Sequence, residues 1–387
     1  MSKLKTSDGL FIIGGGPAGL SAGYFAKKYG LNVSIYEKSG AIGGNCRTIV
    51  DGDFRYDTGA HRLHDKIDTV TKEIKSLLGS DLKRVSAPSK IHFNSTMIDF
   101  PLRFPNIFFQ LKPSLIVNII IENIVNRLKQ KVDINSFKDF AYQKYGKTLS
   151  ELFLISYTEK LWGENTERLD PVISGGRFKH LDVRTLIHSF MNNSKNKPKH
   201  LEGEFYYPRL GFGSIFDRIG EYIGSENIHL NSSVQIINHE KNKVKSVVLE
   251  NGDIIMVENL ISTMPINILA KSLDPQPPNE ILTFLESIRF RTIKLCILYL
   301  SIDQFTENAS IYFPDIGCPF NRIYEPKNRS AEMAPDGKTS IVIEIPMGKN
   351  NINIDIEDDQ LFEEVVFYLQ SKKLLKKETI IKYKMVK

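Results

Sequence analysis

The chain has 387 residues, of which 41% are hydrophobic and 25% are charged, and these proportions are typical of a soluble globular protein. They argue against a collagen-like, a disordered or a disulfide-stapled chain. The 51 basic and 45 acidic residues leave a formal net charge of +6, which permits attraction to anionic substrates but is weak evidence for nucleic acid. At about 150 residues per domain, the length predicts two or three domains, or one large domain with an insertion.

The three cysteines, Cys46, Cys296 and Cys318, include no CxxC pair, so we expect neither a disulfide framework nor a bound metal. The first ten residues are polar and lack the apolar core of a signal peptide. The most lipid-like stretch, Leu115 to Val125, is about half the length that a bilayer span needs. We therefore expect a cytoplasmic protein without a membrane span.

The first fifty residues contain a strand, a glycine-rich turn, a helix, a second strand and an acidic residue, in this order. Leu10–Ile13 and Val33–Tyr36 are short apolar runs that predict buried parallel strands, and helical spacing predicts a helix over Leu20–Tyr29. The turn before this helix reads Gly-Gly-Gly-Pro-Ala-Gly, and Glu37 ends the second strand. This order and spacing are typical of a dinucleotide-binding unit.

Each glycine of this turn has a physical reason in such a unit. Gly14 permits the tight turn, Gly16 lets the backbone approach a pyrophosphate, and Gly19 lets the helix pack closely on the strand. The phosphates would lie at the helix N-terminus, where free N–H groups point outward, and Glu37 would bind the ribose hydroxyls. The predicted cofactor contacts of this unit are Gly14, Gly16, Pro17, Ala18, Gly19, Glu37 and Lys38.

A second glycine-rich segment follows the acidic residue. Gly43 and Gly44 permit backbone conformations that a side chain would forbid, and Arg47 can meet a phosphate with its forked guanidinium. The segment resembles the second phosphate-side motif of the FAD-binding enzymes related to monoamine oxidase, protoporphyrinogen oxidase and UDP-galactopyranose mutase. Residues 54–61 then resemble their segment beside the flavin ring, although residues 57–59 could also be a simple turn. The resemblance implies FAD as the cofactor, with contacts from Gly59, Ala60 and His61.

The rest of the chain predicts a flavin domain that is interrupted by an insertion. Helical periodicity over Leu115–Leu128 and Phe137–Tyr145 predicts a mostly helical segment, with Ser136 or Asn135 as an N-cap. From residue 227 onward, short alternating runs and an Asn251-Gly252 turn predict strands that return to the flavin domain. The strands predicted after them are Ile293–Leu300, Ser310–Phe313 and Ser340–Ile345.

We therefore predict an α/β protein with a Rossmann-like FAD-binding domain, an inserted helical domain and a substrate-side mixed β-sheet. The predicted segments are 1–95 for the first part of the FAD-binding domain, 96–205 for the helical insertion, 206–270 for the second part of the FAD-binding domain and 271–387 for the substrate-side sheet. Val234, in the returning strands, is a further predicted contact of FAD.

Residues 137–163, 175–177, 205–213 and 311–322 resemble segments of UDP-galactopyranose mutase, especially of its eukaryotic branch. The resemblance keeps the order and spacing of that family along nearly the whole chain, and it implies an aromatic sugar-nucleotide site with two diphosphate-binding arginines. The implied substrate contacts are Phe100, Arg103, Tyr157, Thr158, Trp162, Arg177, Tyr312 and Arg322, and the implied catalytic residues are His61, Arg177 and Arg322. Each has a plainer alternative, in which Trp162 packs in the core, the arginines lie on the surface and Tyr312 packs at a strand end.

Two departures from the family concern the substrate. The family has Tyr and Gln in the segment that matches residues 100–103, and it has Asn at the position of Thr158. These differences suggest another nucleotide sugar or another anionic ligand. The family also continues with a strand–glycine–helix segment that closes the cofactor site, so we expect a chain that lacks it to bind FAD weakly or not at all.

The resemblance implies a mutase that interconverts the pyranose and furanose forms of a nucleotide sugar, through an adduct at flavin N5, in surface-polysaccharide synthesis. Such an enzyme needs a reductant for its flavin. One alternative is an oxidase of the amine oxidase or protoporphyrinogen oxidase type, which shares every N-terminal motif. Another is a truncated homologue without catalytic activity.

Overall fold

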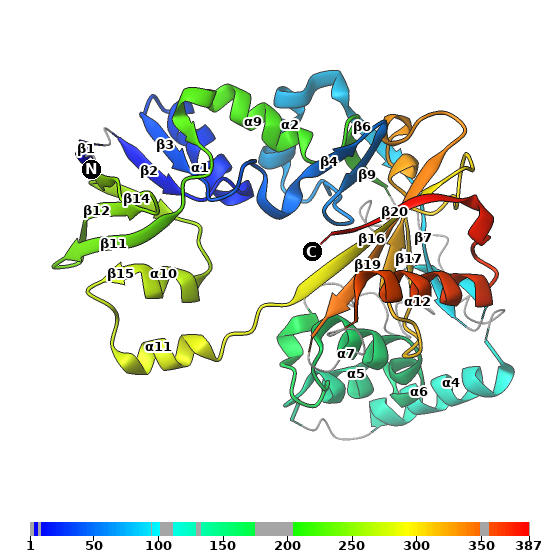
Figure 1. The fold of residues 1–387 in the computed structure, drawn as a ribbon. Coiled ribbons are helices and arrows are strands. Elements are labelled where there is room, and N and C mark those ends of the chain that lie inside the picture. The colour runs from blue at the N-terminus through cyan, green and yellow to red at the C-terminus, as the bar shows by residue number, and fades with distance from the viewer. Residues whose placement is uncertain are drawn as a thin grey trace. The chain divides into compact units, whose positions relative to one another are not determined.

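The computed structural model describes residues 4–6, 9–93, 95–100, 111–128, 133–174, 204–348 and 356–386 of the chain. The chain folds into two compact units (Figure 1). Unit 1 comprises Met1–Val50, Asp57–Lys83 and Tyr207–Phe290, and unit 2 comprises Asp51–Tyr56, Arg84–Tyr206 and Arg291–Lys387. Within the described ranges, none of the helices has both the length and the apolar character that crossing a membrane requires.

Unit 1 is built on a four-stranded parallel sheet in the order β10-β3-β2-β14. Its strands are β10 (Ile228–His229), β3 (Val33–Tyr36), β2 (Leu10–Ile13) and β14 (Asn259–Ser262). The two strands predicted near the N-terminus are thereby confirmed. They read as nearly continuous apolar runs because a parallel sheet is covered on both faces.

Helices α1 (Pro17–Lys28), α9 (Ser214–Ile223) and α2 (Asp68–Leu78) contribute to the core of this sheet. The predicted helix over residues 20–29 is α1, which begins three residues earlier because Pro17 occupies its first turn. A Cβ at Gly23 would lie 2.8 Å from Ile35 Cδ1 and 3.2 Å from Ile223 Cδ1, so the close approach of α1 to the sheet and to α9 requires a glycine there.

A second sheet of unit 1 has the order β1-β13-β12-β11-β15. Its strands are β1 (Leu4–Thr6), β13 (Ile254–Met256), β12 (Lys243–Leu249), β11 (Val234–Glu240) and β15 (Leu273–Asp274). The predicted Asn251-Gly252 turn joins the antiparallel strands β12 and β13, and Gly252 has a φ of 85°. Helices α10 (Ile266–Ser272) and α11 (Asn279–Glu286) complete the unit.

Unit 2 contains a seven-stranded mixed sheet in the order β20-β16-β19-β18-β17-β7-β8. Only the pairing of β17 with β7 is parallel among the ladders described for this sheet. The strands are β20 (Ile380–Val386), β16 (Thr292–Leu300), β19 (Thr339–Met347), β18 (Arg322–Tyr324), β17 (Ser310–Tyr312), β7 (Ser89–Phe93) and β8 (Thr96–Phe100). Two short ladders lie where the chain passes from one unit to the other. They pair β4 (Thr48–Asp51) with β5 (Phe54–Asp57), and β6 (Leu82–Ser86) with β9 (Glu204–Pro208).

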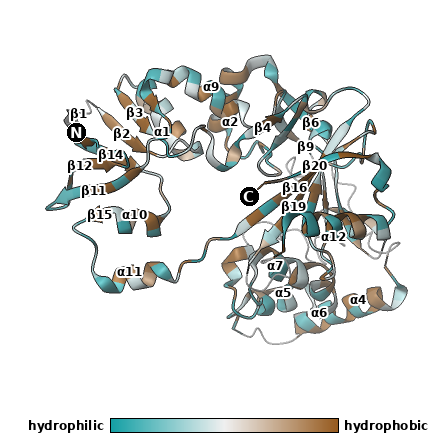
Figure 2. Ribbon diagram, viewed as in Figure 1, coloured by the Kyte–Doolittle hydropathy of each residue, from teal (hydrophilic) through white to brown (hydrophobic). Residues whose placement is uncertain are grey.

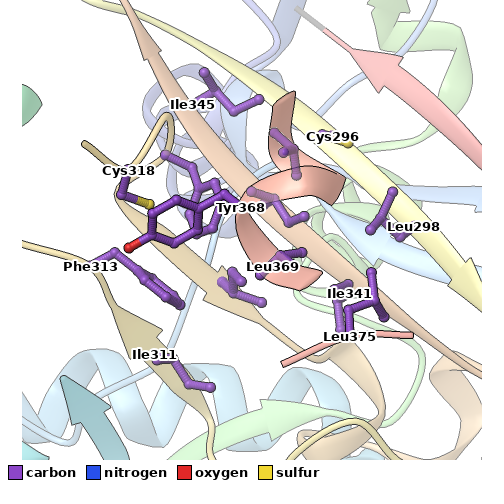
Figure 3. Packing of buried hydrophobic residues seen from close by; sticks show 14 of the residues in the cluster. Cys296, Leu298, Ile311, Phe313, Cys318, Ile341, Ile345, Tyr368, Leu369 and Leu375 are labelled. Carbon is purple, nitrogen blue, oxygen red and sulfur yellow. The ribbon is translucent and has the colours of Figure 1, made fainter. Parts of the chain in front are cut away.

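Every residue of β19 is buried, and helix α12 (Asp358–Ser371) shares a core with one face of the strand, which includes Ile341 and Ile343. Figure 3 shows Tyr368 and Leu369 of α12 beside side chains of β16 and β19, among them Cys296 and Ile345. Figure 2 shows the hydrophobic colour along parts of the same strands. The mixed sheet of the predicted α/β fold is confirmed, whereas α12 was not predicted.

The helical part of unit 2 consists of α4 (Pro113–Leu128), α5 (Phe137–Tyr145), α6 (Lys147–Ser150) and α7 (Ser156–Trp162), with a π-helical turn at Glu151–Ile155. Both predicted helices are therefore confirmed. Helix α5 begins at the predicted cap, where Ser136 Oγ accepts a hydrogen bond of 3.1 Å from the Asp139 N–H.

The two units group the chain differently from the four predicted segments. The helical insertion and the substrate-side sheet belong to one unit, since both lie in unit 2. Residues 271–290 belong to unit 1, because β15 pairs with β11 and α11 packs on α10.

Candidate cofactor and substrate sites

The glycine turn of unit 1 combines two crowded glycines with one open glycine. A Cβ at Gly14, where φ is 102°, would collide with Thr263 Oγ1, and a Cβ at Gly19 would collide with the carbonyl oxygen of Gly14. At Gly16 the backbone is extended, with φ of −78°, and a Cβ would meet nothing closer than Gly44 Cα at 3.9 Å. Protein packing does not explain the glycine at position 16, so the space above it fits an approaching ligand.

The N-terminus of α1 is suited to an anion. Gly16 caps the helix without a side chain, the first turn contains no acidic residue, and Pro17 has no N–H group. Leu20 N donates to Gly16 O, so the N–H groups of Ala18 and Gly19 are left unsatisfied by the helix. These groups and the helix dipole attract a phosphate.

Glu37 follows β3 and is 8% exposed. Its Oε2 accepts a hydrogen bond of 2.7 Å from Gly15 N, and its Oε1 accepts bonds of 2.8 and 2.7 Å from Ser39 N and Oγ. Burial raises the pKa of Glu37, but these hydrogen bonds and the charge of Lys38 outweigh burial, so the pKa lies below its usual value. The ionised carboxylate both holds the glycine turn and can accept hydrogen bonds from a ribose.

The second glycine segment is tied to the first. Gly43 and Gly44 have φ of 96° and 51°, and Gly43 N donates to Gly15 O at 2.8 Å. The Nε of Arg47 is buried and has no hydrogen-bond partner among the described residues. A buried, unpaired cationic donor fits a phosphate, because such donors are rarely left unsatisfied. The open glycine, the helix N-terminus and Arg47 together fit the diphosphate of FAD.

Asp57 connects the segment that resembles the flavin-ring strand to residues 207–213, and it is fully buried. Its Oδ2 accepts from the hydroxyl of Tyr207 at 2.5 Å, and its Oδ1 accepts from Thr48 Oγ1 at 2.6 Å and from Phe212 N at 3.0 Å. The alternative of a simple turn at residues 57–59 does not account for this network. Sequence reasoning did not assign Asp57 a role, although the Phe205–Gly213 motif already indicated a return of the chain at this point.

Two predicted cofactor contacts have neighbours that sequence reasoning did not foresee. The ring of His61 stacks on Phe212 with centroids 5.2 Å apart and planes inclined by 23°. It also lies beside Gly59, where a Cβ would come within 3.0 Å of His61 Cε1. The side chain of Val234 is 6% exposed and packs in the core with Phe11, so a cofactor could meet this residue only at its backbone.

In unit 2, four predicted substrate residues lie together. The ring of Tyr312, at the end of β17, lies 5.1 Å from the ring of Phe100 and 6.0 Å from that of Tyr157, measured between centroids. The guanidinium carbon of Arg322 lies 5.9 Å from the Tyr312 centroid. Residues from β8, α7, β17 and β18 thus form one aromatic cluster with a cation, which we call the Tyr312 cluster.

Arg322 makes a two-pronged ion pair within this cluster. Its Nε and Nη2 donate to the carboxylate of Glu344 at 2.9 and 2.7 Å, and the two side chains are 25% and 8% exposed. Burial would lower the pKa of Arg322, but the charge of Glu344 outweighs burial and raises it, so the guanidinium stays charged. The alternative of a plain surface arginine is therefore wrong. Sequence reasoning missed Glu344, although it is the only charged residue of the apolar strand β19.

The remaining substrate predictions have separate outcomes. Trp162, the last residue of α7, is 44% exposed, so the alternative in which it packs in the core is wrong. Thr158 is 4% exposed. Arg103 and Arg177 lie outside the described residues.

Two cations that sequence reasoning missed hold α7 in place. Arg291 Nε and Nη2 donate to the carbonyl oxygens of Leu161 and Lys160 at 3.0 Å each, and its Nη1 donates to Met347 O at 2.5 Å. Lys160 Nζ donates to the carbonyl oxygens of Phe313 and Asp315 at 2.9 Å each, and burial lowers its pKa to about 8. In the sequence, both resemble ordinary surface cations.

Known proteins resemble this chain in sequence and in fold. Mitochondrial protoporphyrinogen oxidase of Nicotiana tabacum is 38% identical over 66 residues, which cover 17% of this chain and 13% of that enzyme. Protoporphyrinogen oxidase 2 of Arabidopsis thaliana is 34% identical over 67 residues, or 17% of this chain and 12% of that enzyme. These matches span less than a fifth of either chain.

Solved structures match nearly the whole fold. Reduced UDP-galactopyranose mutase superposes with a TM-score of 0.86 at 19% identity, covering 98% of this chain and 83% of that one. A putative protoporphyrinogen oxidase from Exiguobacterium sp. 255-15 superposes with a TM-score of 0.77 at 16% identity, covering 99% and 86%. Putrescine oxidase bound to putrescine reaches 0.68 at 14% identity, covering 100% and 85%. These likenesses establish a shared fold.

The family model described as flavin containing amine oxidoreductase matches residues 17–379, which is most of the chain. The match begins at Pro17, inside the first glycine turn, and it includes the second glycine segment and the whole Tyr312 cluster. The chain therefore belongs to the flavin-containing amine oxidoreductase family, and it is a flavin-dependent enzyme whose cofactor is FAD.

Proposed function

We propose that this enzyme acts on a nucleotide sugar in the manner of UDP-galactopyranose mutase and interconverts its pyranose and furanose forms. The observation that carries the proposal is the Tyr312 cluster, in which the Tyr312 ring lies beside the rings of Phe100 and Tyr157 and beside the guanidinium of Arg322. Aromatic faces suit a uracil or a sugar ring, and a guanidinium suits a diphosphate. The likeness in fold to reduced UDP-galactopyranose mutase supports the same reading.

In this proposal unit 1 binds the cofactor. The α1 N-terminus and Arg47 hold the diphosphate of FAD, Glu37 holds its ribose, and His61 lies in the segment that resembles the strand beside the flavin ring. When bound and reduced, FAD supplies a nucleophilic flavin nitrogen for the anomeric carbon of the sugar.

The residues of unit 2 bind and orient the substrate. Tyr157, Tyr312 and Phe100 stack against its rings and exclude water, and Arg322 stabilises the negative charge that develops on the departing diphosphate. Because Glu344 already occupies two of its donors, Arg322 shares its charge between Glu344 and the diphosphate. The predicted contacts Arg103 and Arg177 would supply further positive charge.

The second candidate is an oxidase. The ion pair between Arg322 and Glu344 favours an oxidase, because a cluster whose positive charge is neutralised also accepts a substrate without phosphate. The sequence match to the tobacco enzyme points in the same direction. In an oxidase, the substrate passes a hydride to FAD, and oxygen or a quinone then takes up the electrons. A homologue without catalytic activity would show neither reaction.

Calorimetry separates these candidates. The FAD-loaded, reduced protein is titrated with UDP and with uridine, which lacks the diphosphate. Binding of UDP that uridine does not reproduce supports the mutase proposal. If the folded, flavin-loaded protein does not bind UDP, the nucleotide-sugar proposal is wrong. Release of hydrogen peroxide with an amine or a porphyrinogen then supports the oxidase.

A further inference from the structure

Lys160 lies on helix α7, three residues and therefore about one helical turn after Tyr157. Its Nζ donates hydrogen bonds of 2.9 Å to the carbonyl oxygens of Phe313 and Asp315. Phe313 directly follows β17, whose last residue is Tyr312. Lys160 therefore links the helix that carries Tyr157 to the end of the strand that carries Tyr312. We call these two hydrogen bonds the Lys160 link.

The two carbonyl oxygens belong to a segment that is itself held by backbone hydrogen bonds. Asp315 O also accepts a bond of 3.2 Å from Cys318 N, and Phe313 N donates to Asn321 O at 2.9 Å. Phe313, Cys318 and Asn321 are all buried. An ammonium group makes a stronger hydrogen bond than a neutral donor does. The Lys160 link thus anchors α7 to a part of unit 2 whose position is already fixed.

The rings of Tyr157 and Tyr312 depend on this anchoring for their separation. Their centroids lie 6.0 Å apart, and their planes are inclined by 78°, so the pair is edge-to-face. Such pairs are favourable over a narrow range of separations. A small movement of α7 relative to β17 would therefore change the aromatic surface that the Tyr312 cluster offers to a base or a sugar ring.

We propose that Lys160 is a positioning residue of the substrate site, which holds Tyr157 in place against Tyr312 and so raises the affinity for a ligand that stacks on these rings. It acts through Tyr157 and not by touching the ligand, because its ammonium is bonded to two carbonyl oxygens of the protein. The identity of the ligand rests on the function proposed above, whereas the Lys160 link does not.

A double-mutant cycle tests the proposal, with UDP binding to the FAD-loaded, reduced protein measured by calorimetry. Lys160→Met keeps the aliphatic stem but removes the donors, and it should weaken UDP binding roughly tenfold, within the range of couplings between neighbouring residues. In a Tyr157→Ala background, Lys160→Met should cause no further loss. Lys160→Arg should restore part of the affinity, because a guanidinium can donate to the same carbonyl oxygens. The control Lys147→Met, at an exposed lysine of α6, should bind UDP like the parent.

Trp162 reports on α7 without any ligand, because it is the last residue of this helix and the only tryptophan of the chain. We expect a red shift of its emission in Lys160→Met, a partial return in Lys160→Arg and no change in Lys147→Met. Circular dichroism melting confirms that each variant is folded. If Lys160→Met does not fold, Lys160→Gln, which keeps a neutral donor, replaces it in the cycle.

Two results would overturn the proposal if the parent binds UDP. One is a folded Lys160→Met variant that binds UDP like the parent. The other is an equal loss from Lys160→Met with and without Tyr157, because Lys160 would then act independently of that ring. If the parent does not bind UDP, the nucleotide-sugar function is wrong, and the emission of Trp162 decides on the Lys160 link alone. A red shift in Lys160→Met then supports the link, and unchanged emission overturns it.

Discussion

Arg322 and Glu344 lie directly opposite each other on the neighbouring strands β18 and β19, and two hydrogen bonds of 2.9 and 2.7 Å join their side chains. This pairing places a permanent counter-charge beside the only cation that the structure describes in contact with the Tyr312 ring. A diphosphate at this cluster therefore competes with a carboxylate of the protein for the same guanidinium. The strength of that competition can be measured.

Removing either partner of this ion pair should lower the stability of the protein, but the two removals should change UDP binding in opposite directions. Arg322→Ala and Glu344→Gln each remove the ion pair, so we expect the free energy of unfolding to fall by about 3 kcal/mol. Their effects on UDP should have opposite signs. Arg322→Ala weakens UDP binding, whereas Glu344→Gln strengthens it because the guanidinium is released.

Urea unfolding and calorimetry with UDP measure the two effects. Arg168→Ala is the control, since its side chain is 78% exposed in the same unit, and it should change neither quantity. If Glu344→Gln weakens UDP binding as much as Arg322→Ala does, Arg322 does not bind the diphosphate.

The open glycine should affect FAD without affecting the fold. In Gly16→Val the new Cβ meets nothing closer than Gly44 Cα at 3.9 Å, so we expect little change in thermal stability. The affinity for FAD should fall by roughly 5- to 150-fold, the equivalent of about 1–3 kcal/mol for an overpacked contact. Fluorescence titration with FAD measures the affinity. Gly317→Val, at another glycine with no close neighbour, is the control; equal FAD binding by both variants would refute the phosphate site.

Arg291 should hold α7 and with it Trp162. Arg291→Ala leaves the carbonyl oxygens of Lys160, Leu161 and Met347 without their cationic donor, so the free energy of unfolding should fall by about 1.5–3 kcal/mol. Trp162 is the only tryptophan of the chain, so its emission reports on this helix. We expect a red shift in the variant and a partial return in Arg291→Lys. The exposed neighbour Arg289 supplies the control Arg289→Ala, whose spectrum should match that of the parent.

Asp51 should make unit 2 sensitive to acid. Hydrogen bonds from the Tyr299 hydroxyl at 2.7 Å and from Lys382 at 3.0 Å, with the charge of Lys384, lower the pKa of Asp51 to about 2. Because this folded-state pKa lies below the unfolded value of about 3.9, the stabilisation is complete above that value and is lost as the pH falls towards 2.

The difference in urea midpoint between the parent and Asp51→Asn should therefore be largest near neutral pH and shrink in acid. Asp53→Asn, an exposed acid in the same turn, should show no such pattern. A pH-independent difference for Asp51→Asn would mean that its charge contributes nothing.

Local patterns in the sequence were sufficient for the strands β2 and β3, the helix α5 with its Ser136 cap, and the glycine turn before α1. Each is specified within about ten residues, because apolar runs, caps and glycines act on the backbone beside them. The first glycine turn, Glu37 and Arg47, which we propose to bind FAD, could be named for the same reason, since they lie within the first fifty residues.

Only the tertiary structure decided which distant side chains meet. Asp57 and Tyr207 are 150 residues apart, and Glu344 reaches Arg322 only because the register of β18 and β19 aligns them. The sequence suggests that Lys160 and Arg291 are surface cations, but in the fold both donate hydrogen bonds to backbone carbonyl oxygens and hold α7 in place. For α4 the helical period showed which residues share a face, but not which face packs inward. Ile116 and Ile119 pack inward, and Asn123 and Asn126 on the inner side bind backbone carbonyls of α5, which no local pattern contains.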